Sequence, residues 1–404
     1  LLICLLFYTP TKCDRWSRMA NFINLGNRIT GDFFVPSSFS NHYRNAFELG
    51  TGGYGTVIAL ELIKDSTRGI AVKRFNKPFD STKQAQRCFR ELQLLRELNH
   101  ENIVKMKFVH TTDRTMQELN SVYLTTEFCG ADLNFRLEQE TPAKHQYSLQ
   151  SFQTMISELL RALKYLNSAN VIHRDLKPDN LAIDDRGKLT LLDFGIARVI
   201  DEHGQMTNDP GTKYYRAIET IAFGHSDQSG CKIYNEKADI WSIGAILCQM
   251  ITGEILFREK IKSDNPILKA LSLCGPIPDC VLVEIDDPAS QHYLHTKSQT
   301  VVRMDFLKHF REEGRPWLWK EVEKNGAALV DFIDRTLAFD HRARMSVDEA
   351  LAHPFLAEVR QPRKEVLAGH AILDVRDQTM EKWREYIWIS IQNSPVRYDE
   401  QVLA

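Results

Sequence analysis

The sequence predicts an α+β protein with a small strand-rich part followed by a larger helical part. From Tyr43 to Lys73, short β-branched and apolar runs alternate with glycine-rich turns, a pattern typical of antiparallel strands. After Gly130 the pattern changes, and the clearest helices are predicted at residues 149–169 and 238–252. Strands first and helices afterwards indicate two lobes with a cleft between them.

Further elements are predicted within the strand-rich part. Residues 83–98 are predicted as a helix, and residues 103–109 and 121–128 as strands. The apolar side chains of that helix recur at helical spacing: Phe89, Leu92, Leu95 and Leu98.

The N-terminal region shows no clear period, and residues 1–42 are interpreted as an irregular arm. The apolar run at residues 1–8 is too short to span a bilayer. A truncated signal peptide is one interpretation of residues 1–18, but no basic stretch precedes the run. We favour an upstream artefact or chain fragment, with Met19 as a candidate start.

Composition excludes several functional classes. The 404 residues are 43% hydrophobic and 26% charged, as in a globular protein with a substantial core, and the formal net charge is -2. We therefore expect neither nucleic acid nor a membrane as a partner. The eight cysteines contain no Cys-x-x-Cys pair, which favours free thiols in a reducing compartment.

A glycine-rich stretch is the first chemical signal. It consists of Gly50, Thr51, Gly52, Gly53, Tyr54 and Gly55, closely followed by Val57. Such glycines let backbone N–H groups approach phosphates. A hairpin turn or a dinucleotide-binding loop has the same spacing, but a dinucleotide site needs a helix directly afterwards. Here residues 57–60 continue as a strand, which favours a loop that covers nucleotide phosphates.

Lys73 and Glu91 form the second signal. Lys73 lies in a strand after the glycine-rich loop, where kinases place a lysine that binds ATP phosphates. Glu91 lies on the predicted helix and is the candidate ion-pair partner of Lys73. Taken alone, each is more simply a solvated surface residue, and only the motifs that follow reverse that interpretation.

The decisive segment carries carboxylate, amide and lysine groups in a fixed order. It reads His173-Arg174-Asp175-Leu176-Lys177-Pro178-Asp179-Asn180 and is followed by Asp193-Phe194-Gly195. Phosphoryl transfer needs a carboxylate that orients the attacking hydroxyl, a role that suits Asp175. Asn180 and Asp193 are hard oxygen ligands suited to Mg²⁺, and Lys177 is positioned to steady the transferred phosphate. Lys177 followed by proline is the serine/threonine-type pattern.

These motifs resemble the protein kinase family. Further stretches resemble the stress-activated, Thr-Gly-Tyr-type branch of the mitogen-activated protein kinases, of which the chain would be a divergent member. They are Lys77-Pro78-Phe79, Arg90-Glu91-Leu92-Gln93-Leu94-Leu95, His100-Glu101-Asn102, Gly130-Ala131-Asp132-Leu133 and Asn180-Leu181-Ala182-Ile183.

The resemblance implies a bilobal protein kinase fold over residues 43–355. The N-lobe would cover about 43–126, the hinge 127–130 and the C-lobe 131–355. Residues 356–404 would form a C-terminal extension that packs on the kinase core.

The resemblance also assigns cofactors and binding residues. ATP and Mg²⁺ are the expected cofactors, with Thr126 as the small gatekeeper and the hinge binding adenine through its backbone. The remaining ATP-binding positions implied are Ala71, Glu127 and Cys129. Asp239 would support the catalytic loop. A hydrophobic spine is implied for Leu95, Met106, His173 and Phe194, and ordinary core packing explains the same four residues.

Regulation follows from the same resemblance. An upstream activating kinase would phosphorylate Thr207, and Arg87, Arg90 and Arg174 would clamp that phosphate. Asp209 stands where relatives carry a tyrosine, so the proline preference toward protein substrates is open. Two alternatives remain: a constitutive or autophosphorylating kinase without proline preference, and a kinase-shaped signalling scaffold.

Other departures from the family concern partners. Ile218 replaces a usual proline, while Glu219 and its expected ion-pair partner Arg344 are retained. The basic run at residues 360–364, with Arg360, Arg363 and Lys364, stands where relatives have an acidic docking patch. Docking peptides with an altered charge preference are expected. We expect a cytoplasmic location, with the nucleus as a second one.

Overall fold

The computed structural model describes residues 22–25, 33–144, 146–199, 213–222, 235–258, 266–283, 285 and 288–394. They form two compact units. Of the described residues, unit 1 contains those up to Glu97, the segment Val104–Phe128 and residues 375–394. Unit 2 contains Leu98–Ile103 and Cys129–Asp374. The first unit is rich in strands and the second in helices, so the predicted α+β bilobal class is confirmed.

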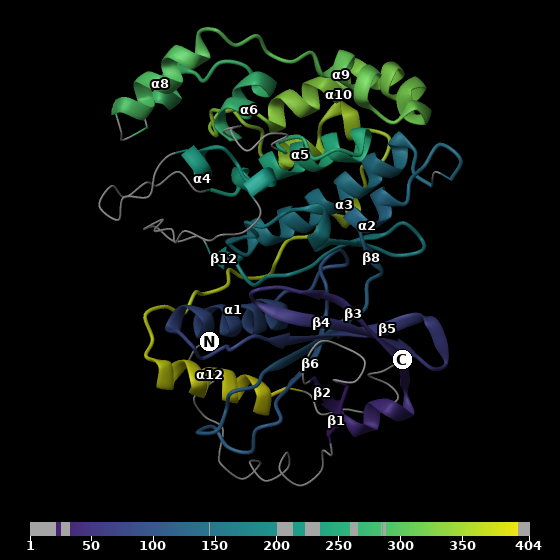
Figure 1. Ribbon diagram of the computed structural model, residues 1–404, viewed down its shortest axis with the longest axis vertical. Helices are drawn as coiled ribbons and strands as arrows, with labels where there is room; N and C mark the ends of the chain where they lie inside the picture. The colour runs from purple at the N-terminus through teal and green to yellow at the C-terminus, as the bar shows by residue number, and fades with distance from the viewer. Residues whose placement is uncertain are drawn as a thin grey trace. The chain divides into compact units, whose positions relative to one another are not determined.

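Unit 1 is built on one antiparallel sheet with the strand order β3-β4-β5-β7-β6. Figure 1 shows these strands together with helices α1 and α12. Its elements are β1 Phe22–Asn24, β2 Phe34–Pro36, the 3₁₀ helix η3 Ser37–Asn41, β3 Tyr43–Thr51, β4 Gly55–Leu62, β5 Asp65–Phe75, α1 Thr82–Glu97, β6 Met106–His110, β7 Tyr123–Glu127 and α12 Met380–Gln392. The predicted helix at 83–98 and the predicted strands at 103–109 and 121–128 are therefore confirmed to within a few residues.

The N-terminal arm is more regular than we expected. Strand β1 pairs antiparallel with β2, and η3 follows directly. Phe33, Val35 and Phe39 are buried against the sheet residues Ile58 and Val72. The interpretation of residues 1–42 as irregular is wrong for this part, because these apolar side chains supply part of the core of unit 1.

The C-terminal helix α12 packs along α1, and the two helices lie side by side in Figure 1. The Phe89 ring lies 5.5 Å from the rings of both Trp383 and Tyr386, measured between centroids. Arg96 at the end of α1 donates to the Ser390 carbonyl at 2.8 Å. The C-terminal extension thus packs on the helix that carries Glu91.

Unit 2 is mainly helical. Its helices and strands are β8 Ala131–Asp132, α2 Leu133–Glu138, α3 Leu149–Ser168, β9 Val171–Ile172, η4 Pro178–Asn180, β10 Leu181–Ile183, β11 Leu189–Leu191, β12 Arg198–Val199, η5 Lys213–Tyr215, α4 Glu219–Ala222, α5 Lys237–Thr252, α6 Pro266–Cys274, α7 Asp279–Leu282, α8 Pro288–Ser298, α9 Phe306–Glu313, η6 Pro316–Leu318, α10 Trp319–Thr336, α11 Val347–Leu351, η7 Pro354–Leu356 and η8 Pro362–Lys364. The two helices predicted at 149–169 and 238–252 correspond to α3 and α5.

Two buried helices and a small sheet organise unit 2. Helix α5 is buried along nearly its whole length, and α3 presents a broad apolar face that starts at a Ser148 capping box. Strands β8, β10 and β11 form an antiparallel sheet in the order β11-β10-β8. Strand β11 of this sheet ends two residues before Asp193. No helix in the described ranges is long and apolar enough to cross a membrane.

Candidate functional site

One face of the unit 1 sheet collects four predicted ATP-binding positions. Val57 pairs with Lys73, and Ala71 pairs with Thr126 across neighbouring strands. Because side chains alternate along a strand, these four lie on the same face, and all four are half-buried. The opposite face, which includes Val72, is buried under the N-terminal arm. The arm therefore leaves only the first of these faces for a ligand.

The glycine-rich loop joins β3 to β4. A Cβ atom added at Gly50, Gly52 or Gly53 would meet no heavy atom within 4 Å, and none of the three has a left-handed φ. Gly55 differs, since a Cβ there would come within 2.7 Å of the Arg74 carbonyl oxygen. The protein itself thus requires only Gly55, and the three bare positions suit a ligand that approaches the backbone closely.

Two side chains hold this loop: Asn76, to which the sequence did not point, and Arg87, which was predicted for the phosphate clamp. Asn76 donates from its side chain to the Gly52 carbonyl at 2.9 Å, and its backbone N–H donates to the Tyr54 carbonyl at 3.1 Å. The Arg87 guanidinium lies 4.8 Å from the Tyr54 ring centroid, a cation–π contact. The loop is therefore fixed from the end of β5 and from α1.

Lys73 and Glu91 form an ion pair. The Lys73 Nζ lies 2.7 Å from Glu91 Oε1 and 2.9 Å from Oε2. The Glu91 side chain is only 3% exposed, so the interpretation of Glu91 as a surface carboxylate is wrong. The pair joins β5 to α1 within unit 1.

The predicted hinge contains the boundary between the two units, which falls between Phe128 and Cys129. On the unit 1 side, the Glu127 N–H donates to the Lys105 carbonyl at 3.1 Å and the Phe128 N–H donates to Gly69 at 3.0 Å. On the unit 2 side, Gly130 has a φ of 103°, and a Cβ there would overlap the Ile183 carbonyl. Only glycine fits this conformation and this close approach. Cys129 and Glu127 are half-buried.

In unit 2, three side chains of the decisive segment meet at Asp175. The Lys177 Nζ lies 2.8 Å from Asp175 Oδ2. The Asn180 side-chain amide donates to the Asp175 carbonyl at 2.7 Å and to its Oδ2 at 2.9 Å. The Asp175 carboxylate is thereby fixed by two donors, Lys177 and Asn180. The short helix η4 begins at Pro178, three residues later.

Asp239, near the start of α5, fixes the backbone of this segment through hydrogen bonds. It is 1% exposed and accepts the backbone N–H groups of His173 and Arg174, each at 2.9 Å. Burial raises the pKa of the Asp239 carboxyl, whereas these two hydrogen bonds act in the opposite direction. Arg174 has a φ of 72°, in the left-handed region that is uncommon for non-glycine residues. The support role expected of Asp239 matches this geometry.

Asp193 follows β11 and is also in the left-handed region, with a φ of 51°. Its Oδ1 accepts the Gly195 N–H at 3.1 Å, and its side chain is exposed. The next ring, Phe194, packs edge-on against His173 with centroids 5.2 Å apart. These two rings of the implied spine are in contact within unit 2.

The donors present suit a divalent metal bound jointly with phosphates. The Asn180 amide nitrogen is occupied by Asp175, which leaves its oxygen as the available ligand atom. In the described part of the chain, no cluster of three or more His, Cys, Asp or Glu side chains could hold a metal by itself. Two protein oxygens with phosphates completing the set is the pattern that Mg²⁺ prefers.

Comparisons with known proteins agree with this geometry. A protein kinase domain matches residues 43–356. The chain is 33% identical over 356 residues to the mitogen-activated protein kinase pmk-1 of Caenorhabditis elegans, which covers 87% of this chain and 86% of that protein. It is 32% identical over 360 residues to human mitogen-activated protein kinase 13, covering 88% and 90% respectively. For mitogen-activated protein kinase 14 of Xenopus laevis the identity is 33% over 347 residues, covering 85% and 88%.

The chain belongs to the mitogen-activated protein kinases. It is a protein serine/threonine kinase and a divergent member of the stress-activated branch. Membership of this family implies ATP as a substrate together with a divalent metal.

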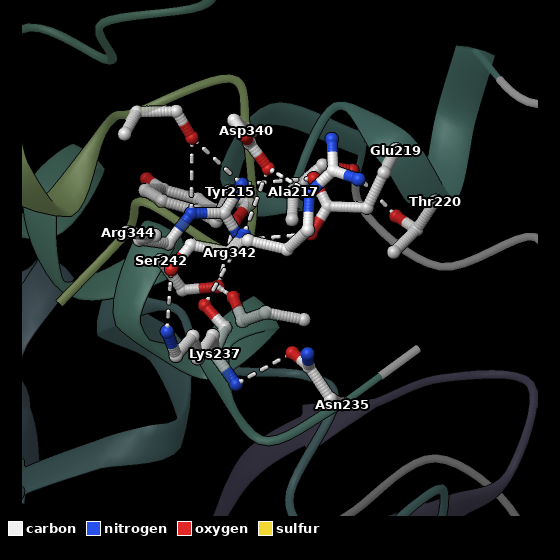
Figure 2. A network of polar contacts seen from close by, with 12 residues as sticks. Tyr215, Ala217, Glu219, Thr220, Asn235, Lys237, Ser242, Asp340, Arg342 and Arg344 are labelled. Atoms are coloured by element: carbon white, nitrogen blue, oxygen red, sulfur yellow. Dashed lines mark hydrogen bonds and ion pairs between the residues drawn. The ribbon is translucent and has the colours of Figure 1, made fainter. Parts of the chain in front are cut away.

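In this mitogen-activated protein kinase, the first residue of α4 is held by a buried ion pair. Figure 2 shows Arg344 facing Glu219, with nitrogen–oxygen distances of 2.7 and 2.9 Å. Both side chains are at most 1% exposed, and Arg344 also donates to the carbonyls of Ala338 and Lys237. The expected partnership of Glu219 and Arg344 is confirmed. Ile218, which replaces the usual proline, is buried beside them.

The predicted phosphate clamp is divided between the two units. Arg87 contacts Tyr54 and Arg90 is buried, both on α1 in unit 1. Arg174 in unit 2 lies with its guanidinium 3.5 Å from the Ile196 carbonyl. Thr207 and Asp209 lie outside the described residues, so the clamp remains a prediction.

Proposed function

We propose that this kinase transfers the γ-phosphate of ATP to serine and threonine side chains of proteins in a stress-type cascade, and that phosphorylation of Thr207 activates it. The observation that carries the proposal is the fixed carboxylate of Asp175, held by Lys177 and Asn180. A positioned carboxylate is what phosphoryl transfer requires to orient an attacking hydroxyl.

Unit 1 would bind the nucleotide. The bare glycines at positions 50, 52 and 53 would let backbone N–H groups contact phosphates. Lys73 would contact the phosphates. Glu91 would hold the Lys73 ammonium group in place, since its Oε1 lies 2.7 Å from Lys73 Nζ. The hinge backbone at Glu127 and Cys129 would bind adenine.

Unit 2 would provide the chemistry. Asp175 would accept the proton of the substrate hydroxyl, and Lys177 would stabilise the transferred phosphate. Asn180 and Asp193 would hold Mg²⁺, which when bound neutralises charge on the phosphates. Retention of Lys73, Glu91, Asp175, Asn180 and Asp193 argues against a scaffold without turnover.

Thr207 would act as the switch. A phosphate there adds roughly two negative charges and three acceptor oxygens, enough to bind several arginines at once. The test compares the parent, Thr207→Ala and Asp209→Ala after treatment with an upstream activating kinase. We expect Thr207→Ala to stay at basal activity and Asp209→Ala to be activated. Full activity of Thr207→Ala would contradict the switch.

A constitutive or autophosphorylating kinase is the second candidate, and one observation favours it. The Lys73–Glu91 pair is already formed in the unmodified chain. The same assay separates the two, because a constitutive enzyme would show high activity in the parent before any treatment and in Thr207→Ala. Peptides with and without proline after the target residue, assayed in parallel, test the proline preference.

The basic run after the kinase core would alter docking. Arg360 donates to Glu365 at 2.7 and 3.2 Å, and Lys364 lies 3.4 Å from Glu101. These pairs occupy the nearby carboxylates, which supports weak binding of basic docking peptides. Calorimetry with a basic peptide and an acid-swapped counterpart tests this, and tight binding of the basic peptide at this surface would refute it.

A further inference from the structure

Asp193 follows strand β11 in the chain. In the small sheet, only one edge of β11 is paired with another strand. Strand β10 pairs with one edge, in the register Leu181 to Leu191 and Ile183 to Leu189. The other edge carries the N–H and carbonyl of Leu189 and the N–H of Leu191. Buried backbone groups of this kind need partners, and a short strand without them has no fixed register.

Asn102 provides two of these partners. Its side-chain amide donates to the Leu189 carbonyl at 2.7 Å, and its backbone carbonyl accepts the Leu191 N–H at 2.8 Å. The next residue, Ile103, forms a parallel bridge with Leu191. Asn102 is fully buried, so no water competes for these bonds. It therefore acts as one residue of an additional strand along β11.

Helix α3 supplies the third partner and fixes Asn102 itself. Glu158 accepts the Leu189 N–H at 2.7 Å, and burial raises the pKa of this carboxyl. Arg161, one turn further along α3 and 2% exposed, donates to the Asn102 side-chain oxygen at 3.3 Å. The same guanidinium lies 3.7 Å from Glu158. The outward N–H and carbonyl of Leu189 and the outward N–H of Leu191 are thus satisfied by side chains or backbone from outside the sheet.

The end of β11 also connects directly to Asn180. The Leu192 N–H donates to the Asn180 carbonyl at 2.8 Å, and the Leu192 carbonyl lies 2.9 Å from His173 Nε2. Asp193 follows in its left-handed conformation, which persists only where the surroundings determine it. A β11 strand free to shift would change the separation of Asp193 from Asn180.

We infer that Asn102 is a positioning residue of this kinase, because it holds β11 in the register that places Asp193 beside Asn180. The inference rests on the proposed roles of Asp193 and Asn180 as metal ligands. Asn102 touches neither nucleotide nor metal in this assignment and acts only through β11. Its removal should therefore weaken Mg²⁺ binding at the nucleotide site more than it weakens metal-free nucleotide binding.

The test measures ADP binding by calorimetry, once in EDTA and once across a Mg²⁺ titration, for the parent and Asn102→Ala. We expect the Mg²⁺ concentration needed for tight ADP binding to rise about tenfold, the scale typical of groups that orient metal ligands. The Kd for ADP in EDTA should stay within about twofold, because those contacts lie elsewhere. Asn99→Ala is the matched control, since Asn99 is exposed in the same segment, and it should match the parent.

The outcomes separate the inference from the proposed function. If Mg²⁺ does not strengthen ADP binding to the parent, the metal role of Asp193 and Asn180 fails. If it does and Asn102→Ala responds as the parent does, the inference is overturned. Should Asn102→Ala not fold, Glu158→Ala removes the acceptor for the Leu189 N–H, and Glu158→Gln retains one. We expect the Mg²⁺ response to weaken in Glu158→Ala and to be largely retained in Glu158→Gln, and equal responses would overturn the inference.

Discussion

At the residue scale, Thr126 is the predicted gatekeeper beside the nucleotide. It lies across from Ala71 and on the same sheet face as Lys73. Its small side chain leaves room on a half-buried face, where a larger side chain would project toward the same ligand. We therefore expect this one side chain to set the size of ligand that binds here.

Thr126→Met should block inhibitors that carry a bulky aryl group beside the adenine position. Overpacking a fitted site typically costs about 1–3 kcal/mol, which corresponds to roughly 5- to 150-fold weaker binding. The KM for ATP should change little, because adenine is expected to contact the hinge backbone. Inhibition constants for an aryl-type inhibitor in both proteins test this, and equal constants would show that Thr126 is not the gatekeeper.

Sequence motifs predicted the residues of the candidate site and some of the residues that hold them, such as Glu91 and Asp239, but not all. Lys73, Asp175 and Asp193 carry distinctive spacing and were found directly. Asn76 has no such signal, and Asn102 lies in a family-like stretch that did not indicate its role, because one asparagine looks like any other until its partners are known. The left-handed backbone conformation of Asp193 could not be predicted from the sequence either, because at a non-glycine residue this conformation depends on the surrounding structure.

At the scale of elements, helix α12 packs against α1 and stabilises its position. Trp383 is 1% exposed and contacts Phe89, which is two residues before Glu91 on α1. The Arg384 guanidinium lies 4.2 Å from the Phe79 ring centroid, just before α1 begins. The position of Glu91 thus depends on a helix that follows the kinase domain in sequence.

Trp383→Ala should destabilise unit 1 and lower activity. Truncating a buried aromatic side chain costs about 3–5 kcal/mol. Displacement of α1 should also weaken the Lys73–Glu91 pair and raise the KM for ATP. Urea unfolding and steady-state kinetics measure the two effects. Trp388→Ala on the same helix is the control, because Trp388 is only half-buried, and an equal effect of both variants would contradict this account.

The helices were predicted because their periodic patterns extend over many residues, and the sheet strands because apolar runs alternate with glycine-rich turns. Strands β1 and β2 have only three residues each, too few for an alternating pattern to stand out. Their role became visible only through tertiary contacts, in which Phe33 and Val35 cover the sheet. Short elements whose burial comes from distant strands are the part of this fold that sequence reasoning could not predict.

At the scale of the whole molecule, the units do not follow sequence order. Leu98–Ile103 belongs to the helical unit although it lies between α1 and β6, and the chain from Val375 onward returns to the strand-rich unit. The sequence shows no composition change at these points. The predicted N-lobe of about 43–126 therefore lacked α12 and included a segment that packs with unit 2.

Folding stability should fall between pH 6.5 and pH 4 because of His110. Its ring stacks on Tyr123 with centroids 4.8 Å apart, and burial lowers its pKa to about 4. Below pH 6.5 the unfolded chain binds a proton at His110 that the folded chain does not, so stability decreases as pH falls. The loss should be about 2 kcal/mol at pH 5.

Urea unfolding at pH 7.5 and pH 5 measures this difference. His110→Phe keeps an aromatic ring in the stack and removes the titrating group, so its loss of stability over the same interval should be smaller by about 2 kcal/mol. His292→Phe, at an exposed position, should behave as the parent does. The same pH dependence in the parent and in His110→Phe would contradict the assignment.

The most direct test of the central claim is transfer of labelled γ-phosphate from ATP to a protein substrate by the purified parent, Lys73→Met and Asp193→Asn. We expect turnover by the parent and a loss of several kcal/mol of transition-state stabilisation in each variant, which leaves almost no activity. Lys77→Met is the control, because Lys77 is exposed, and it should retain parental activity. Unfolding curves of the two variants should stay close to that of the parent, apart from the loss of the Lys73–Glu91 pair. Substantial phosphotransfer by either folded variant would contradict the account.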